Sequence, residues 1–370
     1  MTTFARTDRR FLAMWWWTVD RPLLGAIAVL GLVGVVLVFA AGPAVAARTG
    51  FPTFHFLLRH VVFLLPAAAL LVGASMLSHR GVRAAGHAAL AAGLVLMVAS
   101  LLVGPEIKGA HRWLVVGGLQ LQPSEFVKPA LAVVTAAWLA SRPGLQGAWV
   151  PIGLAALAVG LLLVQPDAGM AVLVAAVLGM QLFLAGLPWF VLLGLTAAAG
   201  LTAWQAYVWL PHVASRIDAF LDPDAIPYQV HWALEAITGG GLLGRGPGEG
   251  SAKFNLPDAH SDFIFAVAVE EFGLIACMAL IALFGFVLLR ALWRARASTG
   301  RFAMLGVAGL IGGFGLQAFV NIGVNLQILP TKGMTLPLVS YGGSSLCATA
   351  LGLGFALALL RPAHEPVDHA

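Results

Sequence analysis

The run LLGAIAVLGLVGVVLVFAAG, from Leu23 to Gly42, holds twenty consecutive residues without a charged side chain. A helix of about 20 apolar residues is long enough to cross the hydrocarbon core of a bilayer. The run is too long for the apolar part of a signal peptide, and no clear cleavage site follows it. It therefore predicts a transmembrane helix.

The rest of the chain continues this pattern. Of its 370 residues, 60% are hydrophobic and only 10% are charged, against about 25% charged in a typical soluble domain. The net charge of +5 is then typical of cytoplasmic loops beside anionic lipid and does not indicate nucleic acid. We predict an all-α, polytopic membrane protein in a single domain, residues 1–370, with ten transmembrane helices at about 23–42, 60–77, 85–103, 125–140, 149–164, 168–187, 189–209, 263–289, 303–326 and 341–360.

The basic residues predict how these helices are oriented. Twelve arginines fall in the short segments on the side of the two termini. Because short loops rich in Lys and Arg stay in the cytoplasm, we place the segments 1–22 and 361–370 there. The longest connection, 208–262, then lies outside, between the seventh and eighth helices. Within it, YQVHWALEAI (228–237) predicts a membrane-surface helix, and the glycine-rich stretch 239–250 predicts a flexible loop.

Polar residues inside the predicted spans are costly and tend to be functional. Glu125 and Lys128, in LQPSEFVKPA, are three residues apart and share one helical face. They either neutralise each other so that the fourth span can insert, or shape a polar cavity. Gln317, Asn321 and Asn325 recur every four residues on one face of the ninth span. They either join helices through hydrogen bonds or line a substrate groove.

The stretch NLPDAHSDFIFAVAVEEFG, from Asn255 to Gly273, brings carboxylates and a histidine to the mouth of the eighth span. Asp262 either caps this helix or works in a cavity together with His260. On a continuous helix, Glu270 would lie about 80° around the axis from Asp262. Glu270 is therefore the deeper carboxylate best placed to share that cavity.

Three cations near these carboxylates are candidates for binding a phosphate group. Arg245 lies in the glycine-rich stretch, and Lys253 follows it closely. Lys332 lies in NLQILPTKGMTLPLVSYGGSSL, 325–346, whose prolines forbid a continuous helix. That segment predicts an irregular turn beside a water-filled cavity. Ser344 lies at the end of this segment, where the tenth span begins, and we expect it close to the same cavity.

Four motifs carry a resemblance to a known family. HSDFIFAVAVEEFG, QPSEFVKP, QPDAG and LPTKGMTLPLVSYGGSSL together resemble the SEDS proteins (shape, elongation, division, sporulation), over about Trp15 to Arg361. The tryptophan-rich start and the P-T-K-G before L-P-L-V-S-Y-G-G are more similar to the division branch, FtsW, than to the elongation branch, RodA. Three positions depart from the family: Ser261 stands where Thr is usual, Met170 where a hydroxyl residue is common, and Asp258 where Glu is frequent, which keeps the charge.

The resemblance implies a peptidoglycan glycosyltransferase that polymerises lipid II into β-1,4-linked glycan strands. It places the essential aspartate of the family at Asp262 and its Glu/Lys pair at Glu125 and Lys128. It also implies a class B penicillin-binding protein transpeptidase and other divisome membrane proteins as partners, with the active site on the periplasmic side of the bacterial inner membrane. A lipid II flippase is the alternative, and a non-catalytic division scaffold is a third. Polar residues concentrated toward the outer half favour the enzyme.

A metal requirement is a separate expectation. The two cysteines lie in apolar runs, and no C-x-x-C or H-x-x-x-H spacing occurs. We therefore predict no metal-ligating residue. A divalent cation, Mg²⁺ or Mn²⁺, would instead help to bind the diphosphate of lipid II.

Overall fold

The computed structural model describes residues 11–107, 109–209, 211–222, 227–297, 300–330 and 333–362. Each of the ten predicted spans is a helix, which confirms the all-α, multi-pass prediction. These helices are α2 (Arg21–Thr49), α3 (His55–Ser75), α4 (His79–Val103), α5 (Pro123–Ser141), α6 (Leu145–Val164), α7 (Ala168–Leu184), α8 (Trp189–Trp209), α11 (Ile264–Arg296), α12 (Arg301–Asn325) and α13 (Gly343–Leu359).

Shorter elements lie before and between these helices. A two-stranded antiparallel hairpin was not predicted, and its turn, Gly117–Gly118, has φ of 59° and 78°, as a type I′ turn requires. The helix predicted at 228–237 is present as α10. The short elements are α1 (Phe11–Thr18), β1 (Leu114–Val116), β2 (Leu119–Leu121), α9 (Pro211–Leu221), α10 (Tyr228–Gly240) and the 3₁₀ helix η1 (Ala252–Phe254).

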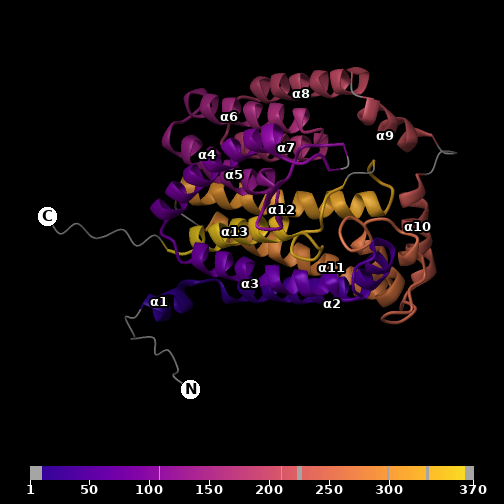
Figure 1. Ribbon diagram of the computed structural model, residues 1–370. Coiled ribbons are helices and arrows are strands. Elements are labelled where there is room, and N and C mark those ends of the chain that lie inside the picture. The colour runs from indigo at the N-terminus through magenta and orange to yellow at the C-terminus, as the bar shows by residue number, and fades with distance from the viewer. Residues whose placement is uncertain are drawn as a thin grey trace.

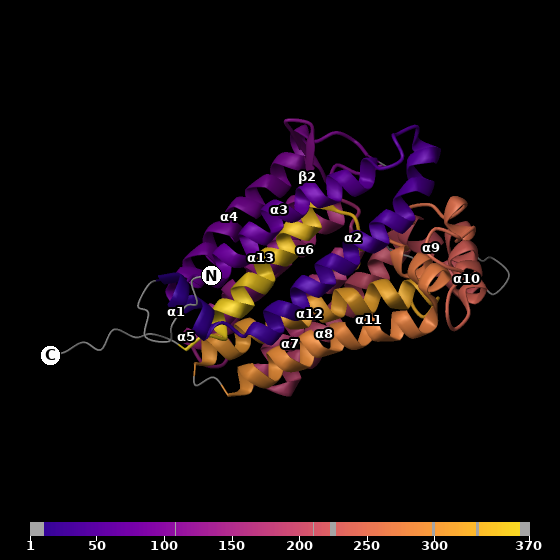
Figure 2. The same cartoon turned by 90° about the horizontal axis from the view of Figure 1, so that it is seen from below.

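Length and composition suit seven of the described helices to crossing a membrane: α2, α3, α4, α6, α8, α11 and α12. α7 and α13 are apolar but have 17 residues each, and α5 contains the charged residues Glu125 and Lys128. α5 and α13 pack against each other and against α12 in the middle of the bundle (Figures 1 and 2). The charges on α5 therefore face protein and not lipid, as charged groups in a membrane require.

α8 is the outermost of the long helices. None of its residues is buried, and it lies along α7 at the top of Figure 1. Its side chains are apolar on every face, which suits a helix that is surrounded by lipid instead of by other helices.

Polar contacts tie several helices together at the end of the bundle that holds α1. Asp20 pairs with Arg290 at 2.7 Å and with Arg294 at 3.3 Å. Arg361, after α13, donates to the Thr18 hydroxyl of α1 at 2.9 Å. Arg290 and Arg294 belong to a helix, because α11 continues to Arg296 and does not end at 289 as predicted. Asp20 supplies the counter-charge that lets the longer helix carry them.

The glycine-rich stretch after α10 is tied to α11, a restraint that its composition does not indicate. α11 breaks at Gly273, whose φ is 82°, and the Arg245 amide donates to the Glu270 carbonyl at 2.9 Å. A Cβ on Gly244 would come within 2.3 Å of the Glu271 carbonyl oxygen, so only glycine fits there. The break makes the first two turns of α11 a separate short helix, whose direction is fixed by the glycine stretch.

Candidate functional site

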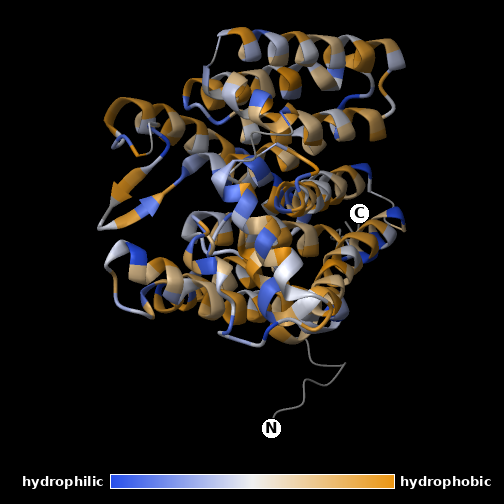
Figure 3. Cartoon of the chain, turned by 90° about the vertical axis from the view of Figure 1, so that its right-hand side faces the viewer, coloured by the Kyte–Doolittle hydropathy of each residue, from blue (hydrophilic) through white to orange (hydrophobic). Residues whose placement is uncertain are grey.

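A polar cavity of about 510 Å³ lies where four helices begin. Its walls come from the N-terminal ends of α5, α7 and α13, the turn 258–262 before α11, strand β2 and the segment 333–335. Figure 3 looks onto this end of the molecule, where hydrophilic segments gather among mostly hydrophobic helices. Four of the predicted site residues line the cavity: Glu125, His260, Asp262 and Ser344.

Asp262 is positioned through its backbone by the polar stripe of α12. The side-chain amides of Asn321 and Asn325 both donate to its carbonyl oxygen, at 2.9 and 3.0 Å. Asn321 also donates to the Met334 carbonyl at 2.6 Å. One side-chain amide therefore joins two segments of the cavity wall, the turn that carries Asp262 and the segment that carries Met334. Asn321 is therefore a buried hydrogen-bonding residue behind the cavity and does not line it.

The start of α11 shows where the carboxylate of Asp262 lies relative to the helix and to the cavity. α11 begins after Phe263, which makes no side-chain capping bond. The backbone amide of Ala266, in the first turn of α11, donates instead to Asn325 Oδ1 at 3.1 Å. Asp262 Oδ2 points toward Gly333, on which a Cβ would come within 2.9 Å of it. The carboxylate of Asp262 thus belongs to the cavity wall.

Beside Asp262, His260 stands in an aromatic cluster. Its ring lies 4.3 Å from that of Phe56 and 5.0 Å from that of Tyr341, and its carbonyl accepts from the Tyr341 amide at 2.9 Å. Burial raises the pKa of the Tyr341 phenol, and a hydrogen bond from Arg59 opposes that shift. Ring packing and the backbone bond together fix the turn that carries Asp262.

Glu125 and Lys128 form the ion pair that their spacing predicts, at 2.7 Å. Lys128 also donates to Gln317 Oε1 at 2.6 Å, and Gln317 Nε2 donates to the Thr335 carbonyl at 2.9 Å. The chain of contacts runs from α5 across α12 to the segment before α13. Both suggested roles are compatible with this geometry, since the pair is neutralised while Glu125 and Gln317 line the cavity.

Ser344 links the hairpin to the start of α13. Its hydroxyl accepts from the Gln122 amide at 3.0 Å and donates to the Gln120 carbonyl at 3.2 Å. This bridge holds β2 over one side of the cavity.

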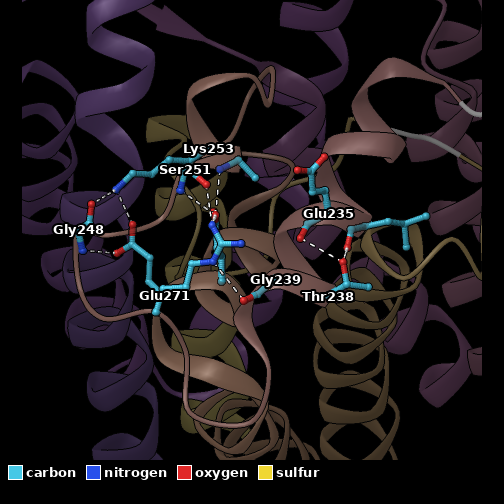
Figure 4. A network of polar contacts seen from close by, with 11 residues as sticks. Glu235, Thr238, Gly239, Gly248, Ser251, Lys253 and Glu271 are labelled. Carbon is cyan, nitrogen blue, oxygen red and sulfur yellow. Dashed lines mark hydrogen bonds and ion pairs between the residues drawn. The ribbon is translucent and has the colours of Figure 1, made fainter.

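Arg245, Lys253 and Glu270 do not line the cavity, and the expected approach of Glu270 to Asp262 is wrong. Glu270 Oε1 accepts from the amides of Ser251 and Ala252 at 2.7 and 2.9 Å and lies 3.5 Å from Arg245. Figure 4 shows this network, in which Lys253 pairs with Glu271. The prediction assumed a helix that is continuous from Asp262 to Glu270, but Asp262 lies in the turn before α11, which starts at Ile264.

One predicted residue, Lys332, lies outside the described residues. Four other charged residues line the cavity and were not predicted as site residues: Arg59, Arg112, Asp167 and Asp258. Asp167 caps α7 by accepting from the Met170 amide at 3.2 Å, and it lies 3.7 Å from Arg112. The QPDAG motif was the available signal for Asp167, whereas Arg59 and Arg112 have no motif around them.

Within the described ranges, no group of three or more His, Cys, Asp or Glu side chains is arranged to hold a metal ion. Mg²⁺ is often bound by only one or two carboxylates together with substrate phosphates. Asp258 and Asp262 both line the cavity. They fit a site in which the ion is held by protein carboxylates and substrate phosphates together, and not a site made of protein ligands alone.

Comparison with known proteins agrees with this geometry. The family model for the cell cycle proteins FtsW, RodA and SpoVE matches residues 21–364. The chain is 47% identical over 366 residues to the probable peptidoglycan glycosyltransferase FtsW of Caulobacter vibrioides, covering 97% of this chain and 93% of that protein. It is 40% identical over 356 residues to the protein of the same name from Nitrosococcus halophilus, covering 91% of each.

Solved structures give the same result. A chain from work described as "Structural coordination of polymerization and crosslinking by a peptidoglycan synthase complex" has a TM-score of 0.78 at 33% identity, covering 95% of this chain and 100% of that one. The rod shape determining protein RodA of Thermus thermophilus has a TM-score of 0.71 at 32% identity, covering 95% and 99%. This chain therefore belongs to the FtsW/RodA/SpoVE family of cell cycle proteins, the SEDS family that its four motifs resemble.

Proposed function

We propose that this chain is a peptidoglycan glycosyltransferase that polymerises lipid II into β-1,4-linked glycan strands and releases undecaprenyl diphosphate. One observation carries the proposal: Asp262, held by two asparagines through its backbone, lines a polar cavity at one end of a membrane-spanning bundle. The names of the relatives support the same activity.

The chemistry requires a base at this position. Lipid II carries an α-linked diphosphate at C1 and the product is β-linked, so the configuration at C1 inverts. The 4-oxygen of the acceptor sugar forms a bond to C1 of the donor, and the bond from C1 to the diphosphate oxygen breaks with its electron pair on the diphosphate. The proton of the 4-hydroxyl moves to the carboxylate of Asp262. A positioned base of this kind contributes about 10²–10⁴-fold in rate.

A divalent cation remains part of the proposal. Asp258 or Asp262 would supply a further ligand to Mg²⁺ or Mn²⁺ bound to the diphosphate. The ion would offset the negative charge that develops on the leaving group. The expected result is polymerisation that falls when EDTA is added and recovers with Mg²⁺ or Mn²⁺. Full activity in EDTA would exclude this part of the proposal without affecting the role of Asp262.

We further propose that the protein acts in septal wall synthesis in the bacterial inner membrane, beside a class B penicillin-binding protein and other divisome membrane proteins. The FtsW names of the relatives support the division role. The structurally similar chain from work on a peptidoglycan synthase complex that coordinates polymerisation and crosslinking supports a transpeptidase partner. The arginines at the α1 end support cytoplasmic termini, which would place the cavity on the periplasmic side.

The test uses the purified full chain in lipid vesicles with defined lipid II, with and without the transpeptidase. Glycan polymer separated on a gel is the expected product. Fluorescent lipid II that crosses the vesicle bilayer without forming polymer would replace the enzyme with the flippase. The polar cavity lies at one end of the bundle, which favours the enzyme, because a flippase needs a polar path at every depth.

A further inference from the structure

The proposed reaction ends with a diphosphate, and the developing charge of such a leaving group is stabilised by nearby cations. Most cations near the site already face a carboxylate. The pairs are Arg112 with Asp167 at 3.7 Å, Lys128 with Glu125 at 2.7 Å, Arg245 with Glu270 at 3.5 Å, and Lys253 with Glu271. Each of these charges is offset before any substrate binds.

Arg59 of α3 differs from these cations. Its side chain is exposed and lines the cavity, and it lies near enough to the phenol of Tyr341 to oppose the rise that burial causes in the pKa of that group. The guanidinium of Arg112, by contrast, donates to the carbonyls of Gln165, at 2.6 Å, and Pro166. Arg59 therefore offers a charge to a ligand in the cavity, whereas Arg112 is occupied in holding a turn.

Arg59 and Asp262, the proposed base, line the same cavity. Tyr341 connects the two, since its hydroxyl contacts Arg59 and its amide donates to His260, two residues before Asp262. Phe63 lies one turn after Arg59 on α3, and a Cβ on Gly343 would come within 2.7 Å of its ring. Arg59 thus stands next to the start of α13, which no side chain caps and whose dipole adds to the attraction for an anion.

We propose that Arg59 binds the diphosphate of the lipid-linked sugar donor and offsets the charge that develops on it as the bond to C1 breaks. This inference rests on the function proposed above. A guanidinium can donate two parallel hydrogen bonds to phosphate oxygens, and a lysine ammonium cannot reproduce that geometry.

A binding experiment tests the proposal without catalysis. The full chain in phosphatidylcholine nanodiscs is titrated with farnesyl diphosphate, and Arg59→Gln is compared with Arg296→Gln, an exposed arginine at the far end of α11. Loss of charge-assisted hydrogen bonds weakens binding by about 10- to 100-fold, so this loss is expected for Arg59→Gln and not for Arg296→Gln. Arg59→Lys should fall between Arg59→Gln and the native chain, with unchanged thermal unfolding.

Two further arms separate the sources of phosphate. Farnesyl monophosphate should bind more weakly than the diphosphate, and nanodiscs with phosphatidylglycerol should leave the diphosphate affinity unchanged. Equal competition by phosphatidylglycerol would identify a phospholipid headgroup site and overturn the proposal. So would native affinity in Arg59→Gln, or no binding by the native chain. If Arg59-dependent binding holds while the native chain makes no glycan, the diphosphate site stands and the proposed function fails.

Discussion

The position of Asp262 is set through its backbone. Two buried amides on α12 converge on one carbonyl oxygen, and the ring of His260 is packed between Phe56 and Tyr341. A base works only within hydrogen-bond reach of the proton that it removes. The residues behind the cavity therefore affect the reaction without touching the substrate.

Asn321→Ala tests this positioning role. It removes the amide that joins the Asp262 and Met334 carbonyls, and a misplacement of the order of 1 Å can cost about 100-fold in rate. We expect kcat to fall by about 10- to 100-fold with little change in KM, measured on lipid II. Gln181→Ala is the matched control, because Gln181 is a buried amide on α7 that donates to the Ala132 and Leu305 carbonyls, away from the cavity. An equal loss of kcat in the control would indicate a general loss of packing.

The Glu125–Lys128 pair allows a prediction about stability. Lys128→Gln leaves a largely buried carboxylate without its counter-charge, which costs about 3–5 kcal/mol. The double variant Glu125→Gln/Lys128→Gln removes both charges and should recover most of that loss. Thermal unfolding in detergent measures both. A single variant as stable as the native chain would mean that the pair is solvated and does not bear on insertion of α5.

At the scale of elements, the decisive feature is the break of α11 at Gly273. The glycine-rich stretch satisfies backbone groups that the break exposes. The Glu271 side chain accepts from the Gly248 amide in that stretch (Figure 4), and the Glu270 side chain accepts from the Ser251 amide just after it. Both carboxylates are buried and face cations or amides, so they are structural. The short first segment of α11 is thereby kept in line with the turn that carries Asp262.

Glycine substitutions test the break. Gly273 has φ of 82°, and a Cβ there would lie 2.4 Å from the backbone of 242–244. We expect Gly273→Ala to lower the unfolding temperature and the yield of folded protein, because strain of this kind costs about 1–3 kcal/mol. Gly285→Ala in the same helix, with no atom within 4 Å of its Cβ position, should be neutral or slightly stabilising. Equal effects of the two would contradict a specific role for the break.

The sequence predicted features that follow from length, composition and spacing along one helix. The ten helices follow from apolar length, and the Glu125–Lys128 contact follows from a spacing of three. The hairpin was missed because its strands have three residues each, too short for an alternating pattern. Glu270 was misplaced because Asp262 lies in a turn before α11, so the angular relation that helical periodicity supplies does not hold between the two residues. Arg59 was missed because its importance depends on which other cations are already paired.

At the scale of the molecule, the two ends of the bundle differ. One end is tied together by the polar contacts of Asp20, Arg290, Arg294 and Arg361, and the other holds the polar cavity. This asymmetry is typical of a site that receives substrate from one leaflet and one compartment.

Cysteine labelling tests the orientation. In a background with Cys277→Ala and Cys347→Ala, Leu119→Cys in the hairpin and Ala297→Cys after α11 place single thiols at opposite ends of the bundle. Both parent residues are exposed. We expect a membrane-impermeant maleimide to label the first in intact spheroplasts and the second only after permeabilisation. The reverse pattern would place the cavity in the cytoplasm.

The central claim is that the carboxylate of Asp262 takes the proton of the acceptor sugar. The most direct measurement is polymerisation of defined lipid II by purified Asp262→Asn, beside the native chain and in the presence of the transpeptidase. The account predicts a rate at least 100-fold lower, with thermal unfolding and transpeptidase binding unchanged. Glycan synthesis by Asp262→Asn at near-native rate would contradict it.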